Sequence, residues 1–146
     1  MNITTNTYAL LIQGPIMSIG QGSYKYKSYL DKNVNIIHHD SELTIKKVVN
    51  KYGSLFNEII LSTWDDEVLS DNFSKFCNLN NIKVYKFKKS KNLFLGSKQI
   101  NKHTRYNNNR VQYTGCFNGI KKIYKSSHVI RIRTDQFINL KNILNQ

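Results

Sequence analysis

The chain has 146 residues, enough for one domain with a sizeable core, and no linker or change of composition divides it. Its formal net charge of +13, from 22 lysines and arginines against 9 acids, favours nucleotides, anionic membranes or nucleic acid as partners; codon bias on a solvated surface explains the charge equally well. No apolar run approaches the ~18 residues of a membrane span, which excludes that class and predicts a cytoplasmic protein.

The first half of the sequence alternates between strand and helix patterns. The apolar run Tyr8–Ile12, closed by Gln13-Gly14-Pro15, predicts a strand buried on both faces. Alternation at 24–27 and 35–38, around a turn at 31–33, indicates a hairpin. A capping residue at Ser41, an apolar stripe and Gly53 predict an amphipathic helix; the stripe is Ile45, Val48, Val49 and Tyr52.

The second half continues this alternation. A buried strand is expected at 58–62, a loop at 63–66, a helix presenting Leu69, Phe73, Phe76 and Cys77, and an edge strand at 82–87. Residues 88–109 form a long polar stretch that we expect to be irregular. An apolar set at helical spacing then predicts an amphipathic helix from Val111, despite Gly115 and Gly119. The set is Tyr113, Cys116, Phe117, Ile120, Ile123 and Tyr124.

A short buried strand at 128–133 follows and runs directly into Asp135. Four strands separated by helices predict an α/β fold, Rossmann-like, with a mostly parallel sheet and flanking helices. Ligand sites in such sheets lie beyond the carboxyl ends of the strands. Asp135 is therefore a candidate ligand for a cation that holds a phosphate.

Cysteine and histidine offer no further site. Cys77 and Cys116 lack metal-ligand spacing and are expected to be reduced structural thiols. The adjacent His38 and His39 would point in opposite directions on a strand and could not share one metal.

Four segments together resemble the WavE-type lipopolysaccharide-synthesis family, in order and spacing, across most of the chain. They are residues 11–16 (LIQGPI), 59–64 (IILSTW), 109–112 (NRVQ) with Thr114 and Gly119, and 130–135 (IRIRTD). The resemblance implies a glycosyltransferase of the GT-A type, whose Rossmann-like half binds a nucleotide sugar and whose Asp-x-Asp motif holds a metal.

The resemblance assigns roles to residues of both end strands. Gln13, Gly14 and Pro15 would form the loop near the base and ribose, and Asp135 would match the last acid of the metal motif. Arg133 stands in the place of the first acid, so one carboxylate and the diphosphate would have to hold a divalent cation, Mg²⁺ or Mn²⁺. Arg133 could also bind a phosphate directly through its two-pronged guanidinium.

Four further residues each have two interpretations. Trp64 could stack on a base or serve as packing, and Asp65 could bind a ribose hydroxyl or cap the next helix. Arg110 and Gln112 lie at a helix start, a natural site for a diphosphate, whereas Arg110 could equally be a surface arginine.

The implied reaction transfers a sugar from a nucleoside diphosphate sugar to a glycan or lipid-linked acceptor in surface polysaccharide synthesis. The family pattern also implies an acceptor-binding half beyond residue 146, so that this chain would be the donor-binding part and inactive alone. The charge further suggests peripheral contact with an anionic inner membrane.

Two other functional classes remain open. One is a basic nucleic-acid-binding module that uses the loop Lys86–Lys102 with Tyr85, Phe87 and Phe94. The chain has no RNP, KH or helix-turn-helix pattern, so specific nucleic-acid recognition is not expected. The other is a degenerate transferase-like domain without catalysis.

Overall fold

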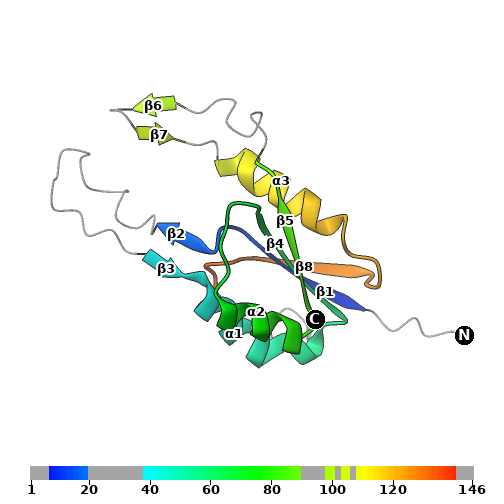
Figure 1. Ribbon diagram of the computed structural model, residues 1–146. Helices are drawn as coiled ribbons and strands as arrows, with labels where there is room; N and C mark the ends of the chain where they lie inside the picture. The colour runs from blue at the N-terminus through cyan, green and yellow to red at the C-terminus, as the bar shows by residue number, and fades with distance from the viewer. Residues whose placement is uncertain (1–6, 20–37, 90–97, 101–102, 106–107, 141–146) are drawn as a thin grey trace, which may run out of the picture.

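Four parallel strands form the main sheet of this computed structural model, which describes residues 7–19, 38–89, 98–100, 103–105 and 108–140 (Figure 1). The strands are β1 (Tyr8–Gln13), β4 (Glu58–Trp64), β5 (Ile82–Phe87) and β8 (His128–Arg133), arranged in the order β5-β4-β1-β8. The chain builds outward from β1 to β5 and then returns to place β8 on the other side of β1. The predicted Rossmann-like α/β fold is confirmed.

Helices cover both faces of this sheet (Figure 1). Helices α1 (Ser41–Tyr52) and α2 (Asp71–Leu79) lie on one face, and α3 (Asn108–Ile120) lies on the other. The side chain of Asp40 caps α1 by accepting the amide of Leu43 at 3.1 Å, so the predicted cap at Ser41 is wrong by one residue. Ser70 caps α2 in the same way.

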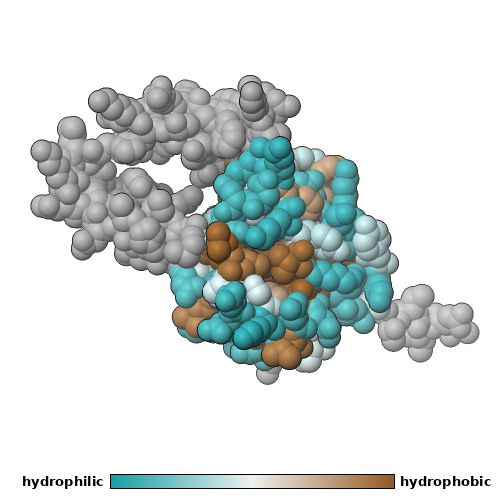
Figure 2. Space-filling model, in the orientation of Figure 1, coloured by the Kyte–Doolittle hydropathy of each residue, from teal (hydrophilic) through white to brown (hydrophobic). Residues whose placement is uncertain are grey.

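The main core lies between the sheet and the pair α1 and α2. The stripe predicted for α1 is buried there as expected, against alternate residues of the strands. This alternation follows from the two-residue period of a strand. The strand residues are Leu10, Ile12, Ile59, Leu61, Ile82 and Ile132, and α2 adds Phe73 and Cys77. At the level of the sheet, Figure 2 shows a hydrophobic band between the two helical layers.

Both cysteines are free thiols, which agrees with the prediction of reduced cysteines. Cys77 is buried in the core, and this burial raises the pKa of its thiol to about 11. Cys77 is therefore an inert core residue rather than a nucleophile.

Helix α3 contacts the sheet through two glycines instead of an apolar stripe. A Cβ on Gly119 would lie 2.4 Å from Cδ1 of Leu11 and 3.1 Å from Cβ of Ser62. The hydroxyl of Ser62 donates to the carbonyl of Gly115 at 2.8 Å. The missing side chains let the helix backbone approach the sheet closely. The expectation that the apolar set forms the packing face of α3 is therefore wrong for its larger part. Tyr113, Phe117, Ile120 and Tyr124 are exposed, and Cys116 and Ile123 are half-buried.

Strand β8 lies at an edge of the sheet, and Ile132 is the one buried residue of its six. The prediction of a buried strand at 128–133 is thus wrong about burial, although its bounds are correct. An edge strand has one neighbour, and α3 lies mainly over β1 and β4. The sequence of β8 is apolar enough for a central strand, but its position leaves Val129 and Arg131 exposed.

Five short elements complete the described part of the fold. β2 (Met17–Ile19) pairs antiparallel with β3 (His38–Asp40), and β6 (Lys98–Ile100) pairs antiparallel with β7 (His103–Arg105). The 3-10 turn η2 (Gly53–Leu55) ends α1 at the glycine predicted to stop it. The hairpin predicted at 24–38 lies outside the described residues except for its last position. The stretch 88–109, expected to be irregular, contains β6 and β7.

Candidate functional site: the carboxyl edge between β1 and β8

The sheet has one topological switch point, between β1 and β8, in the part of the chain that the structure describes. The connections from β1 lead away on one side through β4 and β5, and β8 returns to the other side. In open α/β sheets ligands bind in the crevice at the carboxyl ends of two such strands. Here those ends carry Gln13–Pro15 and Arg133–Asp135, which we call the β1–β8 edge. The edge contains five of the nine residues that the sequence assigned to the site.

The two halves of the β1–β8 edge are joined by hydrogen bonds. The amide of Thr134 donates to the carbonyl of Gln13 at 3.0 Å, and its hydroxyl donates to the carbonyl of Pro15 at 2.7 Å. The amide of Ile16 donates to the carboxylate of Glu67 at 3.0 Å. Thr134 was not among the predicted site residues; its one signal in the sequence was a hydroxyl residue between Arg133 and Asp135. These bonds fix the loop after β1 before any ligand arrives.

Gly14 is required in this loop for two separate reasons. Its φ of 136° is a conformation that other residues rarely adopt. A Cβ there would lie 2.8 Å from Oγ1 of Thr134. The chain leaves β1 at the Gly14-Pro15 pair, as predicted, and Gly14 lets the backbone pass against β8.

Arg133 and Asp135 bind each other within the site. Nε of Arg133 donates to one carboxylate oxygen of Asp135 at 2.9 Å, and Nη2 donates to the other at 2.7 Å. The two side chains are 31% and 21% exposed, so the pair is accessible from solvent. The geometry is the two-pronged one that arginine uses for carboxylates and phosphates. A phosphate would compete with Asp135 for this guanidinium.

The donor set at the β1–β8 edge is small for a metal site held by protein alone. No group of three or more His, Cys, Asp or Glu side chains that could hold an ion occurs among the described residues. Asp135 has lone pairs left after binding Arg133, but the guanidinium beside it repels a cation. A divalent cation here would therefore take most of its ligands from the phosphates of a nucleotide.

Gln13 and Trp64 are covered by α3. Both side chains are almost fully buried, and Gly115 of the helix passes 3.4 Å from the Gln13 amide and 4.0 Å from the Trp64 ring, measured from an added Cβ. Gln13 is the last residue of β1 rather than a loop residue, and Trp64 is the last residue of β4. Of the two interpretations of Trp64, packing is the one observed. Oε1 of Gln13 has no hydrogen-bond partner among the described residues.

The amino end of α3 lies at the same edge as the site. Gly115 contacts Gln13, and Gly119, one turn later, contacts Leu11, so the helix runs antiparallel to β1. Its first turn therefore extends beyond the carboxyl end of β1 and contains Arg110, which is exposed. Backbone amides at a helix start attract anions.

One hydrogen bond joins the start of α3 to β8. Oε1 of Gln112 accepts a hydrogen bond at 3.4 Å from Arg131, a cation that sequence analysis did not select. The sequence signal for Arg131 was its two-residue spacing from Arg133, which places both side chains on the same face of β8. Arg131 and Arg110 add positive charge on the α3 side of the edge, whereas the charge of Arg133 is balanced by Asp135.

Asp65 does not have the capping role that sequence analysis offered as one alternative, because Ser70 caps α2. Its side chain is exposed beyond β4, and its backbone amide donates to the carbonyl of Phe87 at 3.1 Å.

The structure describes two of the three aromatic residues expected to bind bases in a nucleic-acid-binding module. Tyr85 and Phe87 are half-buried and stack on each other, whereas Phe94 lies outside the described residues.

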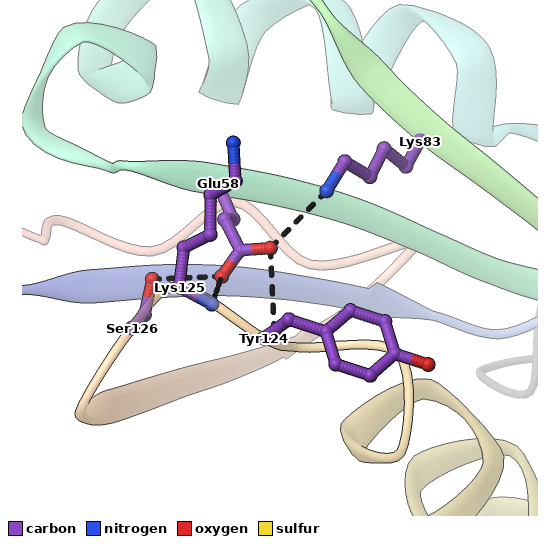
Figure 3. A network of polar contacts seen from close by, with 5 residues as sticks. All are labelled: Glu58, Lys83, Tyr124, Lys125 and Ser126. Atoms are coloured by element: carbon purple, nitrogen blue, oxygen red, sulfur yellow. Dashed lines mark hydrogen bonds and ion pairs between the residues drawn. The ribbon is translucent and has the colours of Figure 1, made fainter.

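A second polar cluster lies at the opposite, amino edge of the sheet, around Glu58 (Figure 3). Its carboxylate is 1% exposed and binds the ammonium of Lys83 at 3.2 Å. Three further donors are the backbone amides of Tyr124 and Lys125 and the hydroxyl of Ser126. Burial alone would raise the pKa of Glu58, but these hydrogen bonds outweigh it, and the pKa lies below its ordinary value. The cluster ties the loop after α3 to β4.

Fold and site together define a Rossmann-like α/β domain whose switch point carries the Arg133–Asp135 ion pair. Compared with models of known families, with curated proteins and with solved structures, the chain matches none. Among the described residues, no helix is long and apolar enough to cross a membrane.

Proposed function

We propose that the β1–β8 edge binds the diphosphate of a nucleotide sugar and that the protein is a GT-A-like glycosyltransferase of surface polysaccharide synthesis. The observation that carries this proposal is the position of the Arg133–Asp135 pair at the switch point of a Rossmann-like sheet. The fixed loop at Gly14 and the first turn of α3 support it, since both lie at the carboxyl end of β1. The resemblance to the WavE-type family agrees with this position.

The chemistry asked of these residues is electrostatic. Sugar transfer breaks the bond between the anomeric carbon and the diphosphate, so negative charge develops on the leaving diphosphate. Arg133 would bind that charge through the fork that now holds Asp135, and Arg110 would add a second cation. A divalent cation, Mg²⁺ or Mn²⁺, would supply further charge when bound with the nucleotide, with Asp135 as its one protein carboxylate. The acceptor would be a glycan or a lipid-linked glycan on the cytoplasmic side.

Calorimetric titration of the chain with UDP, GDP and CDP, with and without Mn²⁺, tests the proposal. We expect binding of at least one nucleotide and a Kd weakened about tenfold in Arg133→Gln, as for the loss of one charged contact. Asp71→Asn and Lys47→Gln are matched controls, because both residues are exposed on helices of the other face. Absence of binding to all three nucleotides, or equal binding by Arg133→Gln, would refute the proposal.

The same titration assigns the role of Asp135. If Asp135 helps to hold a cation, Asp135→Asn abolishes the gain in affinity that Mn²⁺ gives. If Asp135 instead holds Arg133 in place until a phosphate arrives, Asp135→Asn binds nucleotide as tightly as the wild type without Mn²⁺, or more tightly.

A further inference from the structure

An apolar stripe runs along the side of α3 that faces away from the sheet. Tyr113, Phe117 and Ile120 are spaced by four and three residues, which places them on one side of a helix of 3.6 residues per turn. Gly115 and Gly119, on the opposite side, contact the sheet. The three apolar side chains are 70%, 46% and 46% exposed. We call them the outer stripe.

The surroundings of the outer stripe are cationic. Nζ of Lys121 lies 4.1 Å from the ring centre of Phe117, and Lys125 is exposed shortly beyond the helix. Residues 72–134 contain no aspartate or glutamate, and this stretch supplies all of α3 and both edge strands. The α3 side of the molecule thus combines exposed apolar groups with an excess of positive charge, although Lys83 and Arg133 of the edge strands are paired with Glu58 and Asp135.

We propose that the outer stripe of α3 docks on the surface of an anionic lipid bilayer. A helix that carries aromatic and aliphatic side chains outward, with lysines directly after its last turn, is suited to the boundary between headgroups and acyl chains. Tyrosine and phenylalanine insert there, while lysine stems extend along them and leave their ammonium groups at the phosphates. Charge complementarity supports this occupant, because each lysine near an anionic leaflet adds to the attraction.

Other occupants fit the outer stripe less well. A second copy would bring a net charge of +13 against the same charge. Three partly exposed side chains are few beside the ~20–30 residues per side of a standard protein interface. Bases of single-stranded nucleic acid need free aromatic faces, but the rings of Tyr113 and Phe117 stack on each other at 6.0 Å and 10°.

Vesicle flotation of the full chain tests this proposal, with phosphatidylcholine vesicles that contain either no phosphatidylglycerol or about a third of it. We expect binding to the anionic vesicles that falls with added salt. Phe117→Ser should lower the partition coefficient about tenfold, and Lys121→Gln about fivefold. The matched controls are Leu79→Ser, 83% exposed, and Lys75→Gln, also exposed; both lie on α2 and should bind like the wild type.

Three outcomes would overturn the proposal: no flotation of the wild type, equal binding to neutral vesicles, and an equal loss of binding in the α2 controls. Sedimentation equilibrium adds one more: a dimer that Phe117→Ser dissociates would mean that a second copy covers the stripe. All variants replace exposed side chains, and circular dichroism confirms that each is folded before comparison.

Discussion

Both carboxylate oxygens of Asp135 accept hydrogen bonds from the guanidinium of Arg133, so the acid and the base of the β1–β8 edge neutralise each other. Two residues that the sequence assigned to separate ligands therefore form one unit. A phosphate would replace the carboxylate on the arginine, and a cation would replace the arginine on the carboxylate. The proposed nucleotide binding would thus be coupled to the opening of this pair.

The pair should contribute measurably to stability. We expect a coupling of about 1 kcal/mol between Arg133→Gln and Asp135→Asn in a double-mutant cycle by urea unfolding, since each side chain is less than a third exposed. The control pair is Lys89 with Asp66, whose carboxylate side chain is 59% exposed and whose coupling should be smaller. Strictly additive effects at Arg133 and Asp135 would show that the pair does not persist in solution.

Gly14→Ala should destabilise the protein by about 1–3 kcal/mol, the usual cost of a strained backbone conformation. The new Cβ would also press against Oγ1 of Thr134, 2.8 Å away. Urea unfolding of Gly14→Ala in the wild-type and Thr134→Ala backgrounds separates these causes. The cost should be smaller without the threonine hydroxyl but should not vanish, because φ stays positive. Equal stability of Gly14→Ala and wild type would contradict the loop geometry.

The two glycines of α3 should respond differently to alanine. Alanine favours a helix by ~1 kcal/mol over glycine, so Gly115→Ala, whose nearest contact is 3.4 Å, should be neutral or slightly stabilising. Gly119→Ala should instead cost about 1–3 kcal/mol through overpacking against Leu11. Thermal unfolding measures both. A stabilising Gly119→Ala would mean that α3 does not approach the sheet this closely.

Glu58 should make the free energy of unfolding depend on pH in the acidic range. Its folded pKa lies below the unfolded value of ~4.3, so its contribution is complete above that value and is lost as pH falls through the folded pKa. At pH 7, Glu58→Gln should lower the free energy of unfolding by about 2 kcal/mol, because the amide offers the buried donors one oxygen in place of two and loses the ion pair with Lys83.

This difference between the wild type and Glu58→Gln should shrink as the pH falls below 4. Urea unfolding between pH 3 and pH 7 measures it. The control is Asp66→Asn, which removes an exposed partner of Lys89 and should change stability by less than about 0.5 kcal/mol. A difference that does not depend on pH would contradict the network in Figure 3.

Strands and two helices could be predicted because their patterns are local. The apolar run of β1 ends at a Gly-Pro pair, and the stripe of α1 has the helical period. Both patterns identify side chains that become buried on folding, and these side chains form part of the core. The position of Asp135 just beyond the end of β8 could also be predicted, because only Thr134 separates the strand from this acid in the sequence.

Other features depend on tertiary placement and could not be predicted in this way. The apolar pattern of α3 indicated its inner face, whereas Gly115 and Gly119, one turn apart, marked the contact with the sheet. The burial of Gln13 and Trp64 follows from that contact. The ion pair forms because the side chains of Arg133, at the end of β8, and Asp135, two residues later, point to the same side. From the sequence, Arg133 was expected to bind a phosphate and Asp135 a cation.

The most direct test of the central claim is an NMR titration of the isotopically labelled chain with the nucleoside diphosphate that binds most tightly. The account predicts amide shift changes at Gly14, Thr134 and Asp135, together with the first turn of α3. Amides at the opposite edge, near Glu58 and Lys125, should not move. Shift changes confined to that opposite edge, or spread along the lysines without reaching Gly14 and Thr134, would contradict a nucleotide site between β1 and β8.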